Sequence, residues 1–382
     1  MHRVAVFIGT RPEAIKMAPV VAALKADDQL EPVVINAGQH REMIRQVIDL
    51  FGIQVDKDLD VMVKDQTLAG LTSRLVSRID EALAELTPDF VLVQGDTTTV
   101  LCAALASFYR KIPIGHVEAG LRTGNLHSPF PEEANRRLVS PLADLHFAPT
   151  TTSRDALLAE KISEERITVT GNTVIDALLM EVERQQQPEV APQLQAELAE
   201  LVGEEIADRE MILITGHRRE NLGEGFLQIC DAIRQLAELR PEALFVYPVH
   251  LNPRVKDVVH KKLGNLKNVR LIAPQPYTQF VALARASRLI LTDSGGVQEE
   301  APSLGKPVLV MRDTTERPEG VAAGAVKLVG PNTERIVSEA MTLLTDDQAY
   351  QRMAQTANPY GDGNAAERIV EGVRAFLMSD SV

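Results

Sequence analysis

Short apolar runs rich in β-branched residues alternate with longer helical patterns along the whole chain. This alternation is typical of βαβ units that form parallel sheets. Six strands are predicted in the first half, at residues 3–9, 32–37, 89–94, 112–117, 144–147 and 166–170. Six more are predicted in the second half, at residues 210–215, 243–248, 269–272, 287–292, 307–310 and 325–329. The sequence therefore predicts an α/β fold with two parallel sheets.

The length of the chain favours two domains, because 382 residues exceed what one hydrophobic core usually serves. Apolar residues at helical spacing predict a helix over Thr67–Glu85 and a last amphipathic helix over Ala365–Leu377. Between the two halves, the Gln- and Pro-rich stretch Gln185–Pro192 is predicted to be an exposed connection. The segment Leu194–Asp208 matches no motif and is predicted to be variable surface.

Composition and charge exclude several classes of protein. Apolar residues make up 45% of the chain, yet no apolar run approaches the roughly 20 residues of a membrane span. No basic-then-apolar leader opens the sequence, so we expect a cytoplasmic protein without a membrane partner. The net charge of −13 argues against nucleic-acid binding. Cys102 and Cys230 lie in apolar helical patterns and are predicted to be buried, reduced thiols.

A glycine turn between a strand and a helix predicts a phosphate-binding site. The apolar run Leu289–Thr292 is followed by Asp293-Ser294-Gly295-Gly296, and a helical segment containing Glu300 begins there. Such a turn brings backbone N–H groups close to an anion, and the helix N-terminus adds partial positive charge. A second strand-to-helix junction follows Val4–Ile8, with Arg11 at the turn and Pro12 at the first helical position. The two junctions suggest two domains that face one phosphorylated ligand.

Acid/base residues follow several predicted strands. Asp96 follows the strand at 89–94, Glu118 follows the strand at 112–117, and His217 follows the strand at 210–215. Glu132 and Glu133 open a helical pattern. Because ligands of parallel sheets bind at the carboxyl ends of strands, we expect a catalytic site here. Taken singly, Asp96 could instead cap a helix, and Glu132 or Glu133 could be first-turn acids that complement the helix dipole.

Motifs for metals and common cofactors are absent from the sequence. It contains no His-Glu-x-x-His pattern, no cluster of Cys and His, and no Walker A loop. The segment Gly361–Ala366 fits a dinucleotide pattern, but it does not follow a predicted strand, and we reject it. We expect neither a metal nor a cofactor.

Ten motifs, taken together and in this order, give the chain a close resemblance to bacterial non-hydrolysing UDP-N-acetylglucosamine 2-epimerases. They are Gly9–Pro19, Gln39–Met43, Gly95–Thr99, Gly115–Thr123, Pro131–Arg136, Gly171–Asp176, Thr215–Asn221, Tyr247–Pro253, Asp293–Pro302 and Arg312–Glu319. The resemblance extends from about residue 3 to the terminal helix.

The resemblance implies two Rossmann-like domains of the glycosyltransferase B type, with the active site in the interdomain cleft. The implied N-terminal domain covers residues 1–172, and the C-terminal segment 363–382 packs back on it. The implied nucleotide-binding domain covers residues 173–362. Members of this family are typically homodimers.

The implied reaction interconverts UDP-N-acetylglucosamine and UDP-N-acetylmannosamine, for synthesis of bacterial surface polysaccharide precursors. It proceeds by elimination and re-addition of UDP through a 2-acetamidoglucal. By this resemblance Asp96, Glu118 and Glu132 are the acid/base group, and His217 supports the departing diphosphate. Which carboxylate is base and which is acid stays open, and Glu132 could instead organise its neighbours.

The resemblance also implies the residues that contact the substrate. The matched positions are Arg11, Lys16, Asp96, Glu118, His217, Arg218, Gln275, Phe280, Ser294, Gly295, Gly296, Glu300 and Arg317. Some relatives bind a second substrate molecule as an activator, a role that would fall to Gln39, His40, Glu42 and His250. Phe280 could instead be apolar filler under a loop, and the second group could equally form a hydrogen-bonded loop that braces the cleft.

Three other functions compete with epimerisation. A glycosyltransferase of the same fold would need an acceptor and would not exchange the C2 hydrogen. A hydrolysing epimerase would release free sugar. A nucleotide-sugar sensor would bind without turnover, and the presence of Asp96, Glu118, Glu132 and His217 argues against it, because a sensor needs no acid/base groups.

Overall fold

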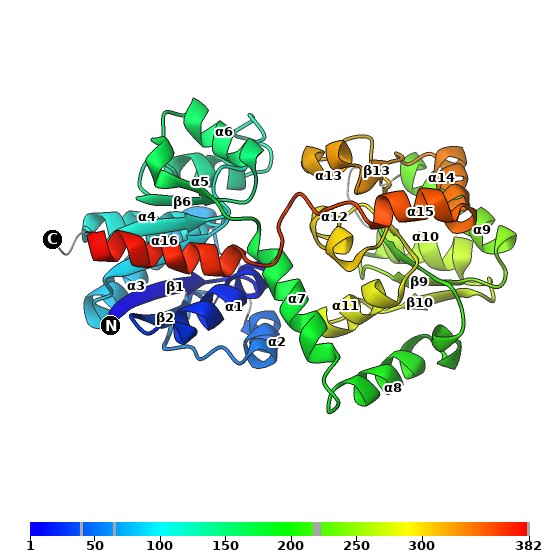
Figure 1. Ribbon diagram of the computed structural model, residues 1–382, viewed down its shortest axis with the longest axis horizontal. Coiled ribbons are helices and arrows are strands. Elements are labelled where there is room, and N and C mark those ends of the chain that lie inside the picture. Colours follow the sequence, from blue (N-terminus) through cyan, green and yellow to red (C-terminus); the bar gives the residue numbers. More distant parts are fainter. Residues whose placement is uncertain (39–40, 64–65, 217–222, 380–382) are drawn as a thin grey trace. The chain divides into compact units, whose positions relative to one another are not determined.

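A computed structural model describes residues 1–38, 41–63, 66–216 and 223–379, apart from the side chains of residues 41–43 and 207. The chain forms two compact units (Figure 1). The first contains Met1–Ala177 together with Tyr360–Val382, and the second contains Leu178–Pro359.

The first unit is built on a seven-stranded parallel sheet with the order β3-β2-β1-β4-β5-β6-β7. Its strands are β1 (His2–Ile8), β2 (Leu30–Asn36), β3 (Lys57–Asp58), β4 (Phe90–Gln94), β5 (Ile114–Val117), β6 (Leu145–Ala148) and β7 (Ile167–Val169). Its helices are α1 (Arg11–Ala26), α2 (Arg41–Phe51), α3 (Leu68–Leu86), α4 (Thr98–Tyr109), α5 (Glu132–Val139), α6 (Thr151–Ala159), the first turns of α7 (Thr173–Gln185) and α16 (Ala365–Ser379). A 3-10 turn covers Glu164–Arg166.

Continuous apolar runs form the central strands because helices cover both faces of a parallel sheet. All five residues of β4 are buried. The C-terminal helix α16, red in Figure 1, returns to this unit and contacts α1 and β6. Its Phe376 meets Phe90 of β4 edge to face, with the ring centroids 5.6 Å apart. The last helix is therefore part of the first hydrophobic core.

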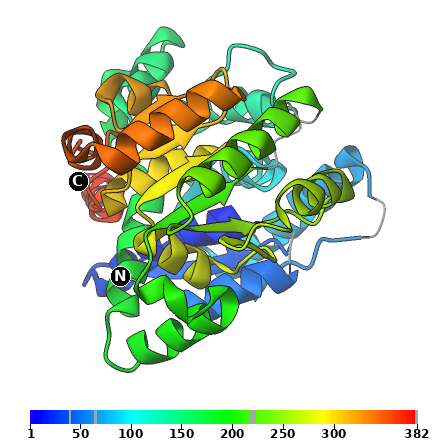
Figure 2. The ribbon, with the colours of Figure 1, turned by 90° about the vertical axis from the view of Figure 1, so that its right-hand side faces the viewer.

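The second unit is built on a six-stranded parallel sheet with the order β10-β9-β8-β11-β12-β13. Its strands are β8 (Met211–Thr215), β9 (Leu244–Pro248), β10 (Val269–Ile272), β11 (Leu289–Thr292), β12 (Val308–Val310) and β13 (Val326–Leu328). Its helices are the rest of α7, α8 (Ala191–Val202), α9 (Glu224–Leu239), α10 (Pro253–Leu263), α11 (Tyr277–Ala286), α12 (Gly295–Glu300), α13 (Pro318–Ala323), α14 (Thr333–Thr345) and α15 (Asp347–Ala354). Two 3-10 turns cover Glu204–Ala207 and Ala301–Leu304. Two apolar clusters, one with α9, α10 and α14 and one with α8 and α11, pack against the sheet, and Figure 2 shows helices on both of its sides.

All twelve predicted strands are present, and their ends agree to within two residues. The two-residue strand β3 was not predicted, because Lys57-Asp58 has no apolar pattern and pairs only with the end of β2. The predicted helices at 67–85 and 365–377 correspond to α3 and α16. Both predicted thiols are free and buried.

Two predictions for residues 185–208 were wrong in part. Residues 186–189 are exposed and lie outside the helices, as predicted for the connection. Gln185 is not part of an exposed connection. It ends α7 and is buried, and its side-chain amide donates to Glu181 at 2.7 Å and to the carbonyl oxygen of Thr278 at 2.9 Å. The segment predicted as surface contains α8, where Leu194, Leu198 and Val202 recur every four residues and are buried in the core. Helical spacing within a polar-looking stretch is the signal that was overlooked.

Both sheets share the strand order of the doubly wound Rossmann fold. In each, the order reverses at one pair of neighbouring strands, β1 and β4 in the first sheet and β8 and β11 in the second. In open α/β sheets, ligands bind outside the carboxyl ends of the strands at this reversal. The fold thus marks one expected ligand edge in each unit.

Candidate acid/base site

Glu118 follows β5 at the ligand edge of the first sheet, and its carboxylate is held by three donors. Lys16 of α1 donates to Oε1 at 2.5 Å, Asn172 donates to the same oxygen at 2.9 Å, and Gln94 at the end of β4 donates to Oε2. The side chain is buried and its backbone is left-handed, with φ of +62°. A non-glycine residue in that conformation is strained and is found mostly where surrounding contacts demand it. The three donors favour the ionised carboxylate.

Asp96 lies in the turn after β4, beside Glu118. The two strands pair in parallel, with Gln94 opposite Val117, and a Cβ placed on Gly95 would lie 3.8 Å from Glu118 Oε2. The predicted alternative role of Asp96 as a helix cap is wrong, because Thr97 caps α4 and accepts from the backbone of Val100 at 3.4 Å. Its carboxylate is thus available for another role.

Four side chains fix the turn at residues 95–97. His116 of β5 donates from Nε2 to the carbonyl oxygen of Gly95 at 2.7 Å, and Asn135 of α5 donates to that of Asp96 at 2.8 Å. Arg136 of α5 donates to the Asp96 carboxylate at 2.8 Å. Thr97 donates its hydroxyl to Glu13 at 2.6 Å. A turn tied down at four points holds its acid in a defined direction.

Glu13 connects the two strand-to-helix turns at the reversal of the first sheet. It is buried, and its Oε2 accepts from the backbone of Gly9 and of Thr10, each at 2.7 Å, while Oε1 accepts from Thr97. Burial raises its pKa, and these donors partly oppose that rise. Glu13 therefore links the turn that precedes Arg11 to the turn that contains Asp96.

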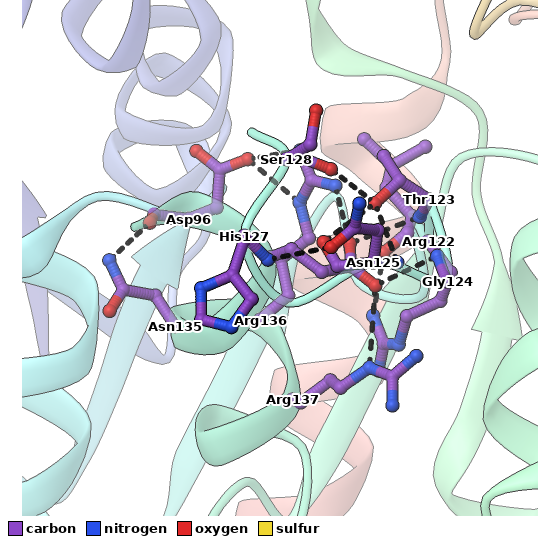
Figure 3. Close-up of polar contacts among 12 residues, drawn as sticks. Asp96, Arg122, Thr123, Gly124, Asn125, His127, Ser128, Asn135, Arg136 and Arg137 are labelled. Carbon is purple, nitrogen blue, oxygen red and sulfur yellow. Dashed lines mark hydrogen bonds and ion pairs between the residues drawn. The ribbon is translucent and has the colours of Figure 1, made fainter. Parts of the chain in front are cut away.

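The α5 acids have different surroundings. Glu133 is fully buried and accepts from the backbone of Thr123 at 3.0 Å and of Gly124 at 3.2 Å, as well as from Arg136 and Arg137. Figure 3 labels the four residues that donate to it, Thr123, Gly124, Arg136 and Arg137. These hydrogen bonds lower the pKa of Glu133 although burial opposes them. Glu132, its neighbour, is only partly buried.

The strand-to-helix junction of the second unit lies where it was predicted, but its two glycines lie in the first turn of the helix and not in a turn before it. Strand β11 ends at Thr292, Ser294 precedes α12, and Gly295 and Gly296 are its first two residues. Thr292 accepts from the backbone of Ser294 at 3.0 Å and contacts Thr215 of β8 at 2.5 Å, which joins the two strands at the reversal. The two glycines therefore open a helix at the ligand edge of the second sheet.

The structure also describes the other predicted site residues of the second unit, which are Gln275, Phe280, Glu300 and Arg317. Tyr277 donates its hydroxyl to Glu300 at 3.4 Å, and Arg317 donates to the buried Glu299 at 2.6 Å. Phe280 packs against the apolar cluster on that face and, with Glu300, lines a cavity of about 10 Å³. This packing is what the filler interpretation of Phe280 predicts. Gln275 donates to the carbonyl oxygen of Ala273 at 2.7 Å.

Two of the predicted site residues, Arg11 and His250, are exposed, and others lie outside the residues that the structure describes. Arg11 is exposed at the start of α1. His250 is exposed, and its Nδ1 accepts from the backbone of Asn252 at 3.1 Å, as expected of a residue that braces a loop. Four predicted residues lie outside the described part of the chain, as does the side chain of Glu42; they are Gln39, His40, His217 and Arg218. Across residues 1–38, 41–63, 66–216 and 223–379, no group of His, Cys, Asp and Glu is arranged to hold a metal ion.

Several residues of this site were not predicted from the sequence. They are Glu13, Gln94, Asn135, Arg136 and Asn172. Gln94 offered a signal, because it is the one polar residue of the strand Phe90–Gln94. Glu13 offered one too, because Thr10 and Glu13 have the spacing of a capping box. For Asn135, Arg136 and Asn172 no local pattern indicated the partner, since each acts on a residue that is distant in the sequence.

Comparisons with known proteins agree on one family. The model of the UDP-N-acetylglucosamine 2-epimerase family matches residues 22–374. The chain is 53% identical to the UDP-N-acetylglucosamine 2-epimerase of Salmonella typhimurium, over 99% of this chain and all of that one. It is 54% identical to the enzyme of Escherichia coli K12, again over 99% of this chain and all of that one.

A solved structure of UDP-GlcNAc 2-epimerase from Neisseria meningitidis, bound to UDP-GlcNAc, has a TM-score of 0.88 and 50% identity, over 98% of this chain and all of that one. Two Rossmann-like sheets, with acids at the ligand edge of one and a helix that begins with two glycines at that of the other, define a two-domain α/β protein of the glycosyltransferase B type. The chain belongs to the UDP-N-acetylglucosamine 2-epimerase family, a family of isomerases. The predicted fold class and family resemblance are thus confirmed.

Proposed function

We propose that this protein interconverts UDP-N-acetylglucosamine and UDP-N-acetylmannosamine by inverting C2. The observation that carries the proposal is the pair of carboxylates on neighbouring strands, Asp96 beside Arg136 and Glu118 beside Lys16. Similarity over nearly the whole chain to proteins named for this activity supports it. Use of the product in surface polysaccharide precursors belongs to the same proposal.

The chemistry explains why the site needs carboxylates. The C2 hydrogen of the sugar is not next to a carbonyl group, so a base alone would remove it too slowly. Loss of that proton together with departure of UDP from C1 gives a 2-acetamidoglucal and free UDP. Proton delivery to the opposite face of C2 and return of UDP to C1 give the epimer. The scheme requires a base, an acid on the other face and groups that stabilise the departing diphosphate.

Asp96, Glu118 and Glu132 are the proposed acid/base group of this chain, and His217 is proposed to support the departing diphosphate. Lys16 and Arg136 supply positive charge next to two of these acids, at 2.5 Å from Glu118 and 2.8 Å from Asp96. The donors around Glu118 favour its ionised form. They support a role for Glu118 as a base or as a fixed negative charge, and the division of acid and base between the carboxylates stays open.

The nucleotide half of the substrate is proposed to bind the second unit. Ser294, Gly295 and Gly296 would hold the diphosphate through backbone N–H groups, and Glu300 would accept from ribose hydroxyls. Gln275 and Phe280 are proposed on the uracil side. Arg11, Lys16 and Arg317 are proposed to contact the nucleotide portion, and Arg218 is proposed to bind the substrate.

Incubation with UDP-N-acetylglucosamine in D2O, with no added metal or NAD, tests this function. We expect NMR to show deuterium at C2 and a mixture of gluco and manno nucleotide sugars, because the proton that returns to C2 exchanges with solvent. Free N-acetylmannosamine plus UDP would instead indicate hydrolysis. Unchanged substrate would contradict the proposal and would favour an acceptor-dependent transferase or a sensor.

We also propose that the protein is a homodimer. Phe108 and Tyr109 at the end of α4 are 53% and 67% exposed, and Leu138 of the contacting helix α5 is 55% exposed. Covering such side chains with a second copy removes apolar surface from water. Sedimentation should show a dimer, and Tyr109→Lys should shift it toward monomer. A monomeric wild type would contradict the proposal.

Two further proposals concern the location of the protein in the cell and a second binding site for substrate. Among the described residues, no helix is both long and apolar enough to cross a bilayer. We propose a cytoplasmic location, which recovery with the membrane fraction of lysed cells would contradict. The activator site at Gln39, His40, Glu42 and His250 stays a prediction. Initial rates that depend on substrate concentration without any cooperativity would count against it.

A further inference from the structure

Arg136 lies between two carboxylates of different kinds. Its Nε and Nη2 both contact Oδ2 of Asp96, at 2.8 and 2.7 Å (Figure 3), while Nη1 contacts Oε2 of Glu133 at 3.0 Å. The arginine side chain is only 13% exposed. One guanidinium group thus holds the proposed catalytic acid with one edge and a fully buried acid with the other.

Glu133 is an anchor for this arginine. Besides Arg136 it accepts from Arg137 at 3.3 Å and from two backbone N–H groups, those of Thr123 and Gly124. Arg136 and Arg137 lie three and four residues after Glu133, so one helical turn brings all three side chains together. With four donors on one buried carboxylate, neither Glu133 nor Arg136 can reorient without breaking other bonds.

Helix α5 also holds the backbone of the same acid. Asn135, next to Arg136, is buried and donates to the carbonyl oxygen of Asp96 at 2.8 Å. Adjacent residues of α5 therefore fix both ends of Asp96, its main chain through Asn135 and its carboxylate through Arg136. This arrangement leaves Oδ1 of Asp96 as the oxygen that Arg136 does not contact.

We propose that Arg136 is a positioning residue for epimerisation. It directs the Asp96 carboxylate, keeps Oδ2 occupied so that Oδ1 faces the reacting sugar, and balances the charge of Asp96, while Glu133 holds Arg136 in place. The proposal rests on the proposed function, because it assigns Arg136 a role through Asp96. Misplacing a catalytic group by about 1 Å can lower a rate about 100-fold.

The planar fork of arginine is needed for this role. A lysine carries the same charge, but it is a single point donor and cannot span Asp96 and Glu133 in one plane. Charge alone would therefore restore only part of the function. The prediction separates geometry from electrostatics.

The test compares Arg136→Ala, Arg136→Lys and the control Arg137→Ala, with kcat, KM and UDP affinity measured for each. We expect Arg136→Ala to lower kcat about 100-fold with KM within about threefold of wild type, and Arg136→Lys to lower kcat about tenfold. Millimolar guanidinium chloride should restore at least a tenth of the lost activity to Arg136→Ala. Arg137 contacts Glu133 but not Asp96, so its variant should keep kcat within about threefold and show no rescue.

Several results would overturn the positioning role of Arg136. A normal kcat in either Arg136 variant would overturn the proposal, as would a rise in KM alone, which would make Arg136 a binding residue. Absence of guanidinium rescue in a folded Arg136→Ala would also overturn it. If Arg136→Ala does not fold, Arg136→Lys decides by its kcat. If the wild type itself incorporates no deuterium at C2, the proposed function fails, whatever the variants show.

Discussion

Replacement of Asp96 by asparagine is expected to lower kcat about 1,000-fold or more while the protein still binds UDP. Asparagine has nearly the same shape and can still accept from Arg136, but it cannot take up or deliver a proton. The turn itself should survive, because His116, Asn135 and Glu13 hold residues 95–97 through atoms that the substitution does not change.

Two readouts check this expectation. Steady-state rates should fall without a matching loss of UDP affinity in calorimetry, and incorporation of deuterium at C2 should fall in proportion. Asp155→Asn is the matched control, since Asp155 is exposed on α6 and pairs only with its neighbour Arg154 among the described residues. A variant at Asp96 with near-normal turnover would show that the acid/base group has been assigned wrongly.

The first unit is expected to lose several kcal/mol of stability when the pH falls from about 7.5 to about 4.5, because two buried histidines stay mostly neutral in the folded protein but take up protons when the chain unfolds. His116 and His146 face each other on β5 and β6, and neither is exposed to solvent. Burial lowers the pKa of His116 to about 4 and that of His146 to about 3. Arg122 opposes a charge on either ring, whereas Asp96 and Glu118 slightly favour one on His116.

The direction follows from proton uptake. Each imidazole has a lower pKa when folded than its unfolded value of 6.5, so the unfolded chain binds more protons as the pH falls below that value. The contribution of the two histidines to stability is fully present above pH 6.5. It is lost progressively as the pH falls from 6.5 toward their folded-state pKa values. Two pH units below 6.5, each histidine should cost about 2.5 kcal/mol, or about 5 kcal/mol for the pair.

Two buried acids of the first unit, Glu13 and Asp176, work in the opposite direction, because burial raises the pKa of each. Asp176 of α7 accepts from the backbone of Ala366 at the start of α16 at 2.7 Å, and burial raises its pKa to about 6. Its folded form therefore takes up a proton more readily than its unfolded form, which offsets about 2 kcal/mol of the loss at pH 4.5. The contribution of the histidines to the loss of stability is therefore measured by comparing a histidine variant with the wild type.

Hydrogen exchange of the β5 and β6 amides measures this unit separately from the second. His146→Leu removes one titrating ring without touching the bond from His116 to Gly95, and it should reduce the loss between the two pH values by about 2.5 kcal/mol. His2→Gln is the control, because His2 lies partly exposed on β1 of the same unit. An unchanged loss in His146→Leu would show that this histidine is not the source of acid sensitivity.

The strands and most of the helices could be predicted because their information is local. The run Leu289–Thr292 followed by Ser294-Gly295-Gly296 specifies a buried strand, a turn and a helix start within eight residues. Periodicity was sufficient even for α8, where Leu194 and Leu198 lie one turn apart, although it was overlooked. Among the strands, only β3 could not be predicted from local pattern. Its two polar residues form a strand because they pair with β2.

By itself the sequence determined which acids follow which strands, and hence that Asp96 and Glu118 meet at one edge of a parallel sheet. Only the tertiary structure decided which groups hold them. Lys16 is 102 residues from Glu118, Asn172 is 54 residues from it, and Arg136 is 40 residues from Asp96. Secondary structure depends on neighbours within a turn or two, whereas these partners become neighbours only after the sheet and its helices have packed. For that reason the acids could be identified from the chain alone, and their surroundings could not.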